Sequence, residues 1–408
     1  MALIHFTGVR RLDPATGLDA TGDWFWDTAT ATFVEDVAGR PVERTIPGEG
    51  RLVLGPALTD LYARCGEPGF EERESLASLA EAARAGGYVR VGLLPDTEPP
   101  LDDPAQVDYL RKGMAESGVE PLIYGALSVG LAGEALAEVG YLAEAGVRGF
   151  TDNRPLTNWA LLRRLLEYAQ VIGRPVLVWP YLAALAGGTA LEGPWALRFG
   201  LAGIPAAAET VALAGLLELV RVTGTPVHCM RLFTARGLAL VRAAKAEGLP
   251  VTASTTVHHL VHASPDLAGY EPCLRFAPPL GNPEDREALV AALVDGTLDA
   301  VASDHTPWTY EEKTLPFSQA PPGAIGLELT LALLWSQVEV GALSALTAWR
   351  ALSLGPEAVL SLTPQRRSLV LFDPCCEWPV ERGALKSRST ATAWLGRTLR
   401  GRVAELFD

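Results

Sequence analysis

Between about Pro56 and Leu360, short apolar runs alternate with longer amphipathic segments. The apolar runs are rich in β-branched residues, as expected for strands buried on both faces. The segments between them are rich in Ala, Leu, Glu and Arg, and glycines follow their ends, as in helices. Clear examples are the runs Val89–Leu94, Pro175–Val178, Val251–Ala253 and Ala300–Ala302, and the helical segments Leu76–Ala85 and Arg236–Glu247. Repeated strand-then-helix units predict a parallel sheet that closes into a barrel.

Both ends of the chain show a different pattern, in which short strand-like runs are separated by turns. Such runs occur before residue 55, broken at Asp13-Pro14 and Pro47-Gly48, and again at Ser368–Phe372 and Gly396–Val403. We therefore expect an α/β fold with a TIM-type (β/α)8 barrel over residues 55–360. Residues 1–54 and 361–408 are expected to build one small β-sandwich beside it. A chain of 408 residues that is 49% hydrophobic can bury a core of this size.

Composition narrows the range of partners. The net charge is −14, from 34 Lys and Arg against 48 Asp and Glu, and no basic block is present, so we expect no nucleic-acid partner. No apolar run is long enough to span a bilayer and the first residues lack a charged leader, which predicts a cytoplasmic protein without membrane contact. The five cysteines form no CxxC pair, and we expect reduced, mostly buried thiols.

A series of short motifs occurs in the order in which one enzyme family carries them. The first is Gly55–Phe70, with the sequence GPALTDLYARCGEPGF. Further motifs are Leu94–Pro99, Phe150–Asn153, Gly200–Pro205, Val257–Leu260, Ala302–Pro307, Leu371–Pro374 and Gly396–Gly401. With them the chain resembles, over almost its whole length, the dihydroorotases of the amidohydrolase superfamily. It is most similar to the bacterial class that associates with aspartate carbamoyltransferase, which implies a place in pyrimidine biosynthesis.

The resemblance implies a zinc site, because dihydroorotases open or close a cyclic amide with a metal-activated hydroxide. Their ligands are His and carboxylate side chains at the carboxyl ends of barrel strands. In this chain five of those positions carry residues that are poor zinc ligands or repel a cation, namely Tyr62, Arg64, Asn153, Trp179 and Arg231. Only Asp304, at the position of the family's general base, keeps its carboxylate, and we expect it to be vestigial. The prediction is a chain that binds no metal and no other cofactor.

The positions at which the family recognises its substrate have also changed. The arginine that would bind the dihydroorotate carboxylate falls on Gly66, and its asparagine partner falls on Asp96, which repels an anion. A histidine falls on Trp308, and an asparagine falls on Ala277, before Pro278-Pro279. Losses at the metal and substrate positions agree with one another.

Three hypotheses follow from these substitutions. The first is a catalytically inactive dihydroorotase homologue that acts as a non-catalytic partner of aspartate carbamoyltransferase; a homo-oligomer is compatible with this role. The second is an active cyclic amide hydrolase with a rearranged mononuclear metal site on Asp152, Asp304 and His305. The third is a binding module in which Arg64 and Arg231 favour an anion, beside an aromatic cage of Tyr62, Trp179, Tyr181 and Trp308.

Two alternatives to these functional interpretations carry more weight. We favour large side chains that simply fill the volume left by the metals, over a cage for a new ligand. His258 and His259 are adjacent and point in different directions, so we expect both to be structural residues. We expect the same of His305.

Overall fold

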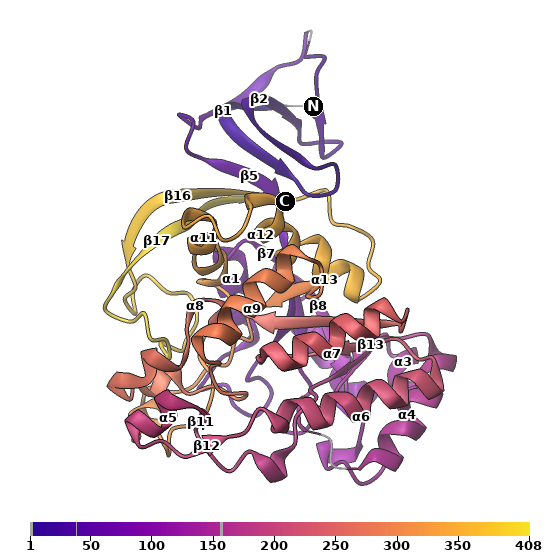
Figure 1. Ribbon diagram of the computed structural model, residues 1–408. Coiled ribbons are helices and arrows are strands. Elements are labelled where there is room, and N and C mark those ends of the chain that lie inside the picture. Colours follow the sequence, from indigo (N-terminus) through magenta and orange to yellow (C-terminus); the bar gives the residue numbers. More distant parts are fainter. Residues whose placement is uncertain (1–2, 38, 156–157) are drawn as a thin grey trace.

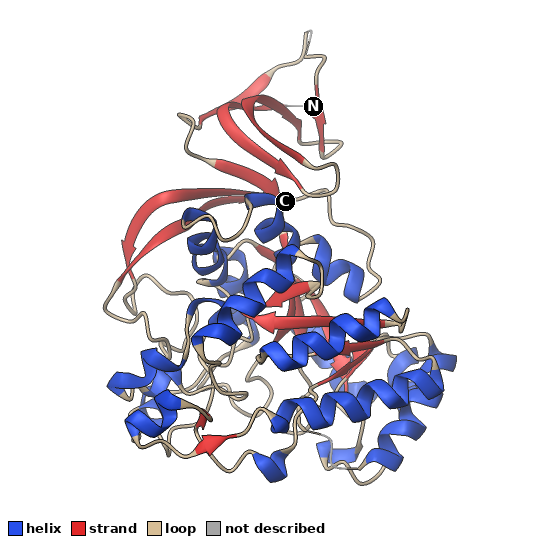
Figure 2. Cartoon of the chain, viewed as in Figure 1, coloured by secondary structure: helices blue, strands red, loops and turns tan. Residues whose placement is uncertain are grey.

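The computed structural model describes residues 3–37, 39–155 and 158–408. Figure 1 shows a small sheet at one end of the molecule, above a larger body in which helices surround a ring of strands. The same view coloured by secondary structure shows that the small part consists of strands and loops (Figure 2). The two parts correspond to the two patterns in the sequence.

The larger part is a nearly closed parallel barrel, as predicted. Its eight strands follow the order β15-β14-β13-β10-β9-β8-β7-β6, and a bridge between Ala63 and His305 connects the two edges. The strands are β6 (Leu58–Ala63), β7 (Tyr88–Leu93), β8 (Glu120–Gly125), β9 (Gly149–Phe150), β10 (Val176–Val178), β13 (Val227–Cys229), β14 (Val251–Thr256) and β15 (Ala300–Ala302). All six residues of β6 are buried, which explains why the strands are continuous apolar runs rather than alternating ones.

Helices follow the barrel strands and cover them on the outside. They are α1 (Leu76–Ala85), α2 (Pro104–Gly113), α3 (Val139–Glu144), α4 (Trp159–Ile172), α5 (Pro194–Phe199), α6 (Ala207–Thr223), α7 (Ala235–Ala246), α8 (Val257–Val261), α9 (Pro283–Val294), α10 (Tyr310–Lys313), α11 (Thr330–Glu339), α12 (Ala345–Leu352) and α13 (Leu354–Val359). Short 3-10 turns are η1 (Val129–Leu131), η2 (Ala183–Leu185), η3 (Ser264–Gly269) and η4 (Pro272–Leu274).

Local signals in the sequence set the ends of these helices. α1 begins after a capping box in which Ser75 and Ser78 satisfy each other's backbone amides, and it ends at Gly86, as predicted. α4 and α6 end at glycines in the left-handed conformation, Gly173 with φ 67° and Gly224 with φ 67°. Only glycine adopts that conformation without strain, so these residues direct the chain into the next strand.

Both chain ends contribute to the second sheet, which confirms the prediction. Its seven strands follow the order β17-β16-β5-β1-β2-β3, and β4 pairs with β1. They are β1 (Leu3–Asp13), β2 (Leu18–Asp27), β3 (Thr32–Val34), β4 (Val42–Pro47), β5 (Val53–Pro56), β16 (Leu369–Pro379) and β17 (Thr398–Phe407). Phe6 and Phe407 meet edge to face with ring centroids 5.4 Å apart, so this terminal sheet closes around apolar contacts between the two ends.

The stretch 183–214, which is rich in Ala and Gly, contains several short elements. A two-stranded sheet of β11 (Ala190–Leu191) and β12 (Gly203–Ile204) flanks α5 and precedes α6. The strands are two residues each, too short for a hydrophobic period to reveal.

The remaining general expectations concern thiols and membranes. All five cysteines are free; Cys65, Cys229 and Cys273 are buried, as expected, whereas Cys375 is exposed. In the described ranges, no helix combines the length and apolarity that crossing a membrane requires.

Candidate functional site

The six positions that the resemblance assigns to metal ligands lie together at the barrel mouth. Tyr62 is on β6, and the other five lie within three residues of a strand end: Arg64 after β6, Asn153 after β9, Trp179 after β10, Arg231 after β13 and Asp304 after β15. Carboxyl ends of parallel strands meet at one end of a barrel. The contacts among these side chains define a connected polar cluster, which we call the mouth network.

An ion pair between Arg231 and Asp304 is the centre of the mouth network. The Arg231 Nε donates to both Asp304 oxygens at 3.0 Å, and its Nη2 donates to Oδ1 at 2.6 Å. Arg231 is 3% exposed and Asp304 is 9% exposed. Burial by itself lowers the pKa of Arg231, but the Asp304 charge and hydrogen bonds raise it above its usual value. The pair is therefore a desolvated, bidentate salt bridge.

The third nitrogen of the Arg231 guanidinium and the faces of the group also have contacts. Its Nη1 donates to Asn153 Oδ1 at 2.6 Å. The rings of Tyr62 and Trp179 lie 4.9 Å and 5.2 Å from the guanidinium carbon. Two of the four aromatic residues considered as a cage, Tyr62 and Trp179, thus already contact a cation, and this cation is the chain's own Arg231. This geometry agrees with the filled-pocket expectation.

A second, more exposed layer covers this pair. Arg64 Nε donates to Asp96 Oδ2 at 2.6 Å, and Asn153 Nδ2 donates to the same oxygen at 3.0 Å. The Arg64 side chain is 32% exposed and that of Asp96 is 16% exposed. Asn153 therefore joins the outer pair to the inner one, and the network as a whole balances two guanidinium groups with two carboxylates.

The backbone at three of these positions is strained. Asn153, Arg231 and Asp304 have φ values of 52°, 55° and 45°, in the left-handed region that non-glycine residues rarely adopt. Each such residue costs on the order of 1–3 kcal/mol, so the surrounding contacts must hold it. The side chains of these three residues meet in the hydrogen bonds described above.

The hypothesis of a rearranged metal site on Asp152, Asp304 and His305 is wrong for this structure. Asp152 accepts hydrogen bonds from Leu127 N, Ser128 N and Ser128 Oγ, away from Asp304. His305 donates from Nε2 to Glu74 at 3.2 Å and accepts from Gly326 N at Nδ1. Across residues 3–37, 39–155 and 158–408, no three His, Cys, Asp or Glu side chains are grouped so that they could hold a metal.

The neighbouring histidines are also engaged. His259 Nδ1 bonds to Thr256 Oγ1 at 2.8 Å, and its Nε2 donates to the carbonyl oxygens of Pro278 and Pro279. Burial lowers the pKa of His259 to about 4. His258 stacks on Phe276 with centroids 4.6 Å apart. Among the described residues, neither histidine belongs to a group of His, Cys, Asp or Glu side chains that could hold a metal.

Known proteins with similar sequences and similar structures agree with the predicted family and fold. A family described as dihydro-orotase-like matches residues 50–236. A dihydroorotase-like protein of Synechocystis sp. is 39% identical over 97% of this chain and 97% of its own length. A dihydroorotase of Geobacter sp. is 35% identical over 97% of this chain and 95% of its own length.

The chain belongs to the dihydroorotase-like family. Two solved structures with low sequence identity have the same fold. L-hydantoinase from Arthrobacter aurescens superimposes with a TM-score of 0.86 at 20% identity, over 99% of this chain and 94% of its own. D-hydantoinase from Thermus sp. does so with a TM-score of 0.78 at 19% identity, over 98% and 93%.

In this dihydroorotase-like chain, the position expected to carry the substrate arginine has no room for a side chain. Gly66 has φ 71°, and a Cβ there would lie 2.5 Å from the Glu74 carbonyl oxygen. Glycine is thus required by the local backbone, and an arginine cannot be restored without moving the loop.

Besides Gly66, the resemblance assigns Asp96, Trp308 and Ala277 to substrate contacts. Trp308 donates from its indole to Pro322 O, and its ring stacks on the Arg73 guanidinium at 4.5 Å. Ala277 precedes Pro278 in the loop that contacts His259. Arg64 and Asp96 of the mouth network line a cavity of about 420 Å³ together with Trp308, whereas Ala277 does not line it.

Sequence reasoning did not predict the salt bridge between Arg231 and Asp304. The signal was present: an arginine at one ligand position and a retained aspartate at another, both at strand ends of the same barrel. Because such positions converge, opposite charges at two of them indicate a pair.

Proposed function

We propose that this dihydroorotase-like chain is a non-catalytic member of its family. The observation that carries the proposal is the buried pair of Arg231 and Asp304. It brings a permanent positive charge onto the one retained family carboxylate, at the place where the resemblance puts zinc. A divalent cation there would meet a guanidinium at 2.6 Å from its ligand oxygen.

The chemistry of the family also lacks its other requirements here. Cyclic amide hydrolysis needs a metal to lower the pKa of water and to polarise the carbonyl group. The residues at the proposed ligand positions do not fit zinc, since Asn153 Oδ1 and both Asp304 oxygens already accept from Arg231. A general base without an activated water contributes little. These arguments support an inactive barrel.

We propose that the protein acts through its outer surface, by binding another protein, rather than through the barrel pocket. The proposed partner is aspartate carbamoyltransferase. Its support is the resemblance to the bacterial class that associates with that enzyme, together with the preservation of the full-length fold. A stable association of this kind would bury roughly 1,600 Å² or more. We further propose that the protein is cytoplasmic, as its place in pyrimidine biosynthesis requires.

The first experiment tests catalysis. Purified protein, with and without added zinc, is assayed for carbamoyl-aspartate cyclisation, and its zinc content is measured by elemental analysis. We expect no turnover above background and no stoichiometric zinc. The double variant Tyr62→His with Arg64→His should remain inactive, because groups that act as a unit are not repaired singly. The Geobacter sp. dihydroorotase, assayed in parallel, is the positive control.

The second experiment tests the partner. The chain is mixed with aspartate carbamoyltransferase from the same organism and analysed by size exclusion with light scattering. We expect co-elution at a fixed ratio and a higher melting temperature of the transferase. Separate elution of the chain and the transferase, with no change in the melting temperature of the transferase, would contradict the partnership. Zinc-dependent turnover in the first experiment would contradict inactivity.

A further inference from the structure

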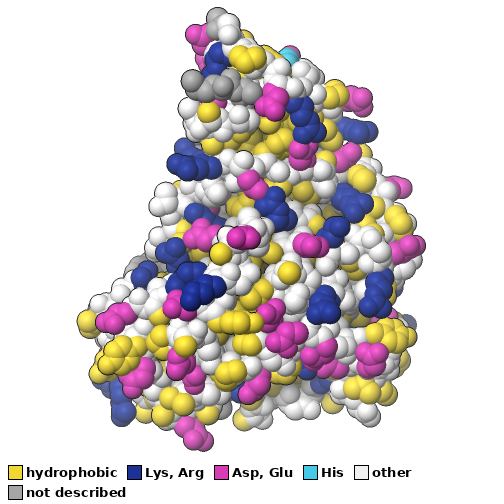
Figure 3. All heavy atoms as spheres, turned by 180° about the vertical axis from the view of Figure 1, so that it is seen from behind, with side chains coloured by type: hydrophobic (Ala, Val, Ile, Leu, Met, Phe, Trp, Pro, Cys, Tyr) yellow, Lys and Arg dark blue, Asp and Glu magenta, His cyan; other side chains and the backbone are white. Residues whose placement is uncertain are grey.

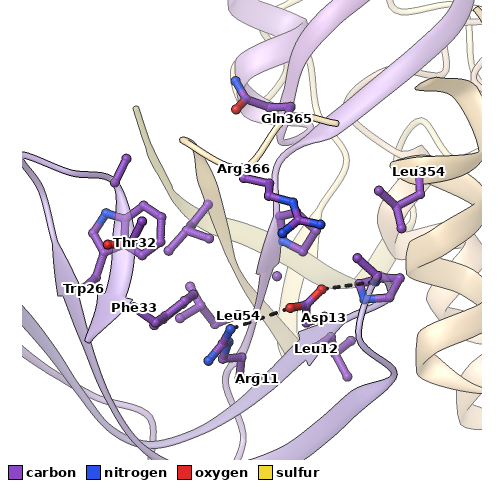
Figure 4. Close-up of a pocket in the computed structure, with 16 residues that line it drawn as sticks. Arg11, Leu12, Asp13, Trp26, Thr32, Phe33, Leu54, Leu354, Gln365 and Arg366 are labelled. Carbon is purple, nitrogen blue, oxygen red and sulfur yellow. Dashed lines mark hydrogen bonds and ion pairs between the residues drawn. The ribbon is translucent and has the colours of Figure 1, made fainter. Parts of the chain in front are cut away.

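A separate cavity lies between the terminal sheet and the barrel. It has a volume of about 230 Å³ and is lined by residues of the terminal sheet, of α13 and of the segment before β16. Figure 4 shows Trp26 and Phe33 on one side and Leu354 on the other. We call this cavity the junction pocket. None of the residues of the mouth network lines it.

The walls of the junction pocket are mainly apolar and include flat aromatic faces. Trp26 is 4% exposed and meets Phe33 edge to face with centroids 4.8 Å apart. Leu54 and Leu369 are buried and belong to the same hydrophobic cluster as Trp26. From behind, Figure 3 shows hydrophobic side chains gathered where the terminal sheet meets the body of the molecule. Concave apolar sites with a few polar groups are typical of small-ligand binding.

Two guanidinium groups and one carboxylate provide the polar part of the lining. Arg11 lies over the Phe33 ring at 3.6 Å and pairs with Asp13 at 3.7 Å. Arg366 extends toward the centre of the pocket (Figure 4). In the part of the chain that the structure describes, no hydrogen bond or ion pair engages the Arg366 guanidinium. The lining therefore has one more cation than anions, and the unpaired cation lies beside the apolar wall.

We propose that the junction pocket binds a small aromatic carboxylate, with its ring against Trp26, Phe33 and Leu54 and its carboxylate on Arg366. A planar guanidinium binds a carboxylate through two parallel hydrogen bonds. The limited volume suits a one-ring acid rather than a nucleotide. The inference is independent of the mouth network and of the proposed function.

Binding would join the two parts of the molecule, because the pocket takes residues from both. A ligand that binds only the folded state raises its stability by mass action. The expected affinity is modest, on the order of a millimolar Kd, since a one-ring acid has few atoms. Benzoate is the probe, and benzyl alcohol and acetate supply the ring and the anion separately.

The test measures Kd by ligand-observed NMR and the shift in melting temperature on the full chain. We expect benzoate to bind about tenfold or more tightly than either comparator, and Arg366→Gln to weaken benzoate about tenfold. Arg367→Gln is the matched control, since Arg367 is exposed and does not line the pocket. It should leave Kd unchanged. Leu354→Trp, which fills the cavity, should abolish binding.

Two results would overturn the proposal. One is absence of benzoate binding at about ten times the expected Kd. The other is equal binding by the wild type and by Arg366→Gln, which would place the benzoate elsewhere. Arg366 is exposed, so its substitution is not expected to unfold the chain, and the circular dichroism spectrum of each variant checks this.

Discussion

The tripeptide Ser303-Asp304-His305 contributes side chains to two regions of the molecule in which polar residues have different roles. Asp304 faces the barrel mouth and pairs with Arg231. Its two neighbours bond into the barrel wall: Ser303 to Asp60, and His305 to Glu74. Neighbouring residues along the chain therefore belong to two different regions, the mouth network and this wall region.

The wall region is a set of carboxylates that tie the chain segments together. Asp60 accepts from Ser303 N at 2.7 Å and from Ser303 Oγ at 2.6 Å. Glu74, fully buried, accepts from His305 at 3.2 Å and from Arg388 N at 3.1 Å, and also from Ser78 and Ser387. These bonds connect β6, the loop after it, β15 and the C-terminal segment.

The mouth network and the wall region also differ in how their residues relate to the family resemblance. Asp60, Ser303 and His305 lie in motifs that carry the resemblance, and they bond within the scaffold. So does Asp152, which accepts from the backbone after β8. The positions aligned with ligands contact one another instead. These four residues therefore have structural roles that do not depend on a metal, and a shared fold does not by itself imply a shared activity.

The largest expected effect comes from breaking the mouth pair. Asp304→Ala should destabilise the protein by about 3–5 kcal/mol in urea unfolding, because it leaves the buried Arg231 cation without its carboxylate. The double variant Arg231→Met with Asp304→Leu should recover most of that loss.

The matched control is Asp19→Ala, which removes the partner of Arg10 in an exposed bidentate pair. It should cost about 0–1 kcal/mol. If Asp304→Ala costs no more than this control, the mouth pair is not desolvated as described.

A smaller loss of stability is expected when a carboxylate of the wall region is replaced. Burial raises the pKa of Glu74, but hydrogen bonds from His305, Ser387 and Ser78 outweigh it, so that the pKa is lowered and the ionised carboxylate is stabilised. Glu74→Gln should cost about 1.5–3 kcal/mol, because an amide cannot accept from all of these donors. Unlike the mouth, no apolar double variant should restore this stability, since one donor is the backbone amide of Arg388. Full recovery by Glu74→Leu with His305→Leu would contradict the distinction.

A carboxylate of the wall region should also make the free energy of unfolding depend on pH. Burial raises the pKa of Asp60 to about 7, although hydrogen bonds from Ser303 oppose this. Between the unfolded value of 3.8 and about 7 the native state holds a proton that the unfolded state has lost, so stability falls as pH rises. Asp60→Asn should remove a slope of at most about 1.4 kcal/mol per pH unit.

A second buried carboxylate, Glu209, should make the stability fall over a range that extends to higher pH than the effect of Asp60. Burial raises the pKa of Glu209 to about 8, so Glu209→Gln should remove the slope that continues between pH 7 and pH 8. The measurement is urea unfolding from pH 4 to pH 8. A slope in Asp60→Asn equal to that of the wild type would reject the assignment.

The smallest effect is expected in the outer layer of the mouth. Arg64→Gln should change the unfolding free energy by about 0–1 kcal/mol, because Arg64 is partly exposed and Asn153 continues to donate to Asp96. Thermal unfolding measures it. A loss as large as that of Asp304→Ala would show that the two layers form a single cooperative unit.

Much of the fold could be predicted because the signals are local. Strand-like runs and helix ends gave the barrel and the terminal sheet, and Leu76–Ala85 was predicted with the bounds of α1. The two-residue strands β11 and β12 could not be, since periodicity needs more residues than they contain.

By itself, the sequence determined the alternation that builds the barrel, the joining of strand-rich ends and the substitutions at aligned ligand positions. The tertiary structure decided which of these residues meet. Arg231 and Asp304 are 73 residues apart and pair because β13 and β15 end at the same mouth. Gly66 excludes a side chain because the Glu74 carbonyl lies against it. Hydrophobic periodicity encodes which side of an element is buried, whereas contacts between elements depend on how the barrel closes.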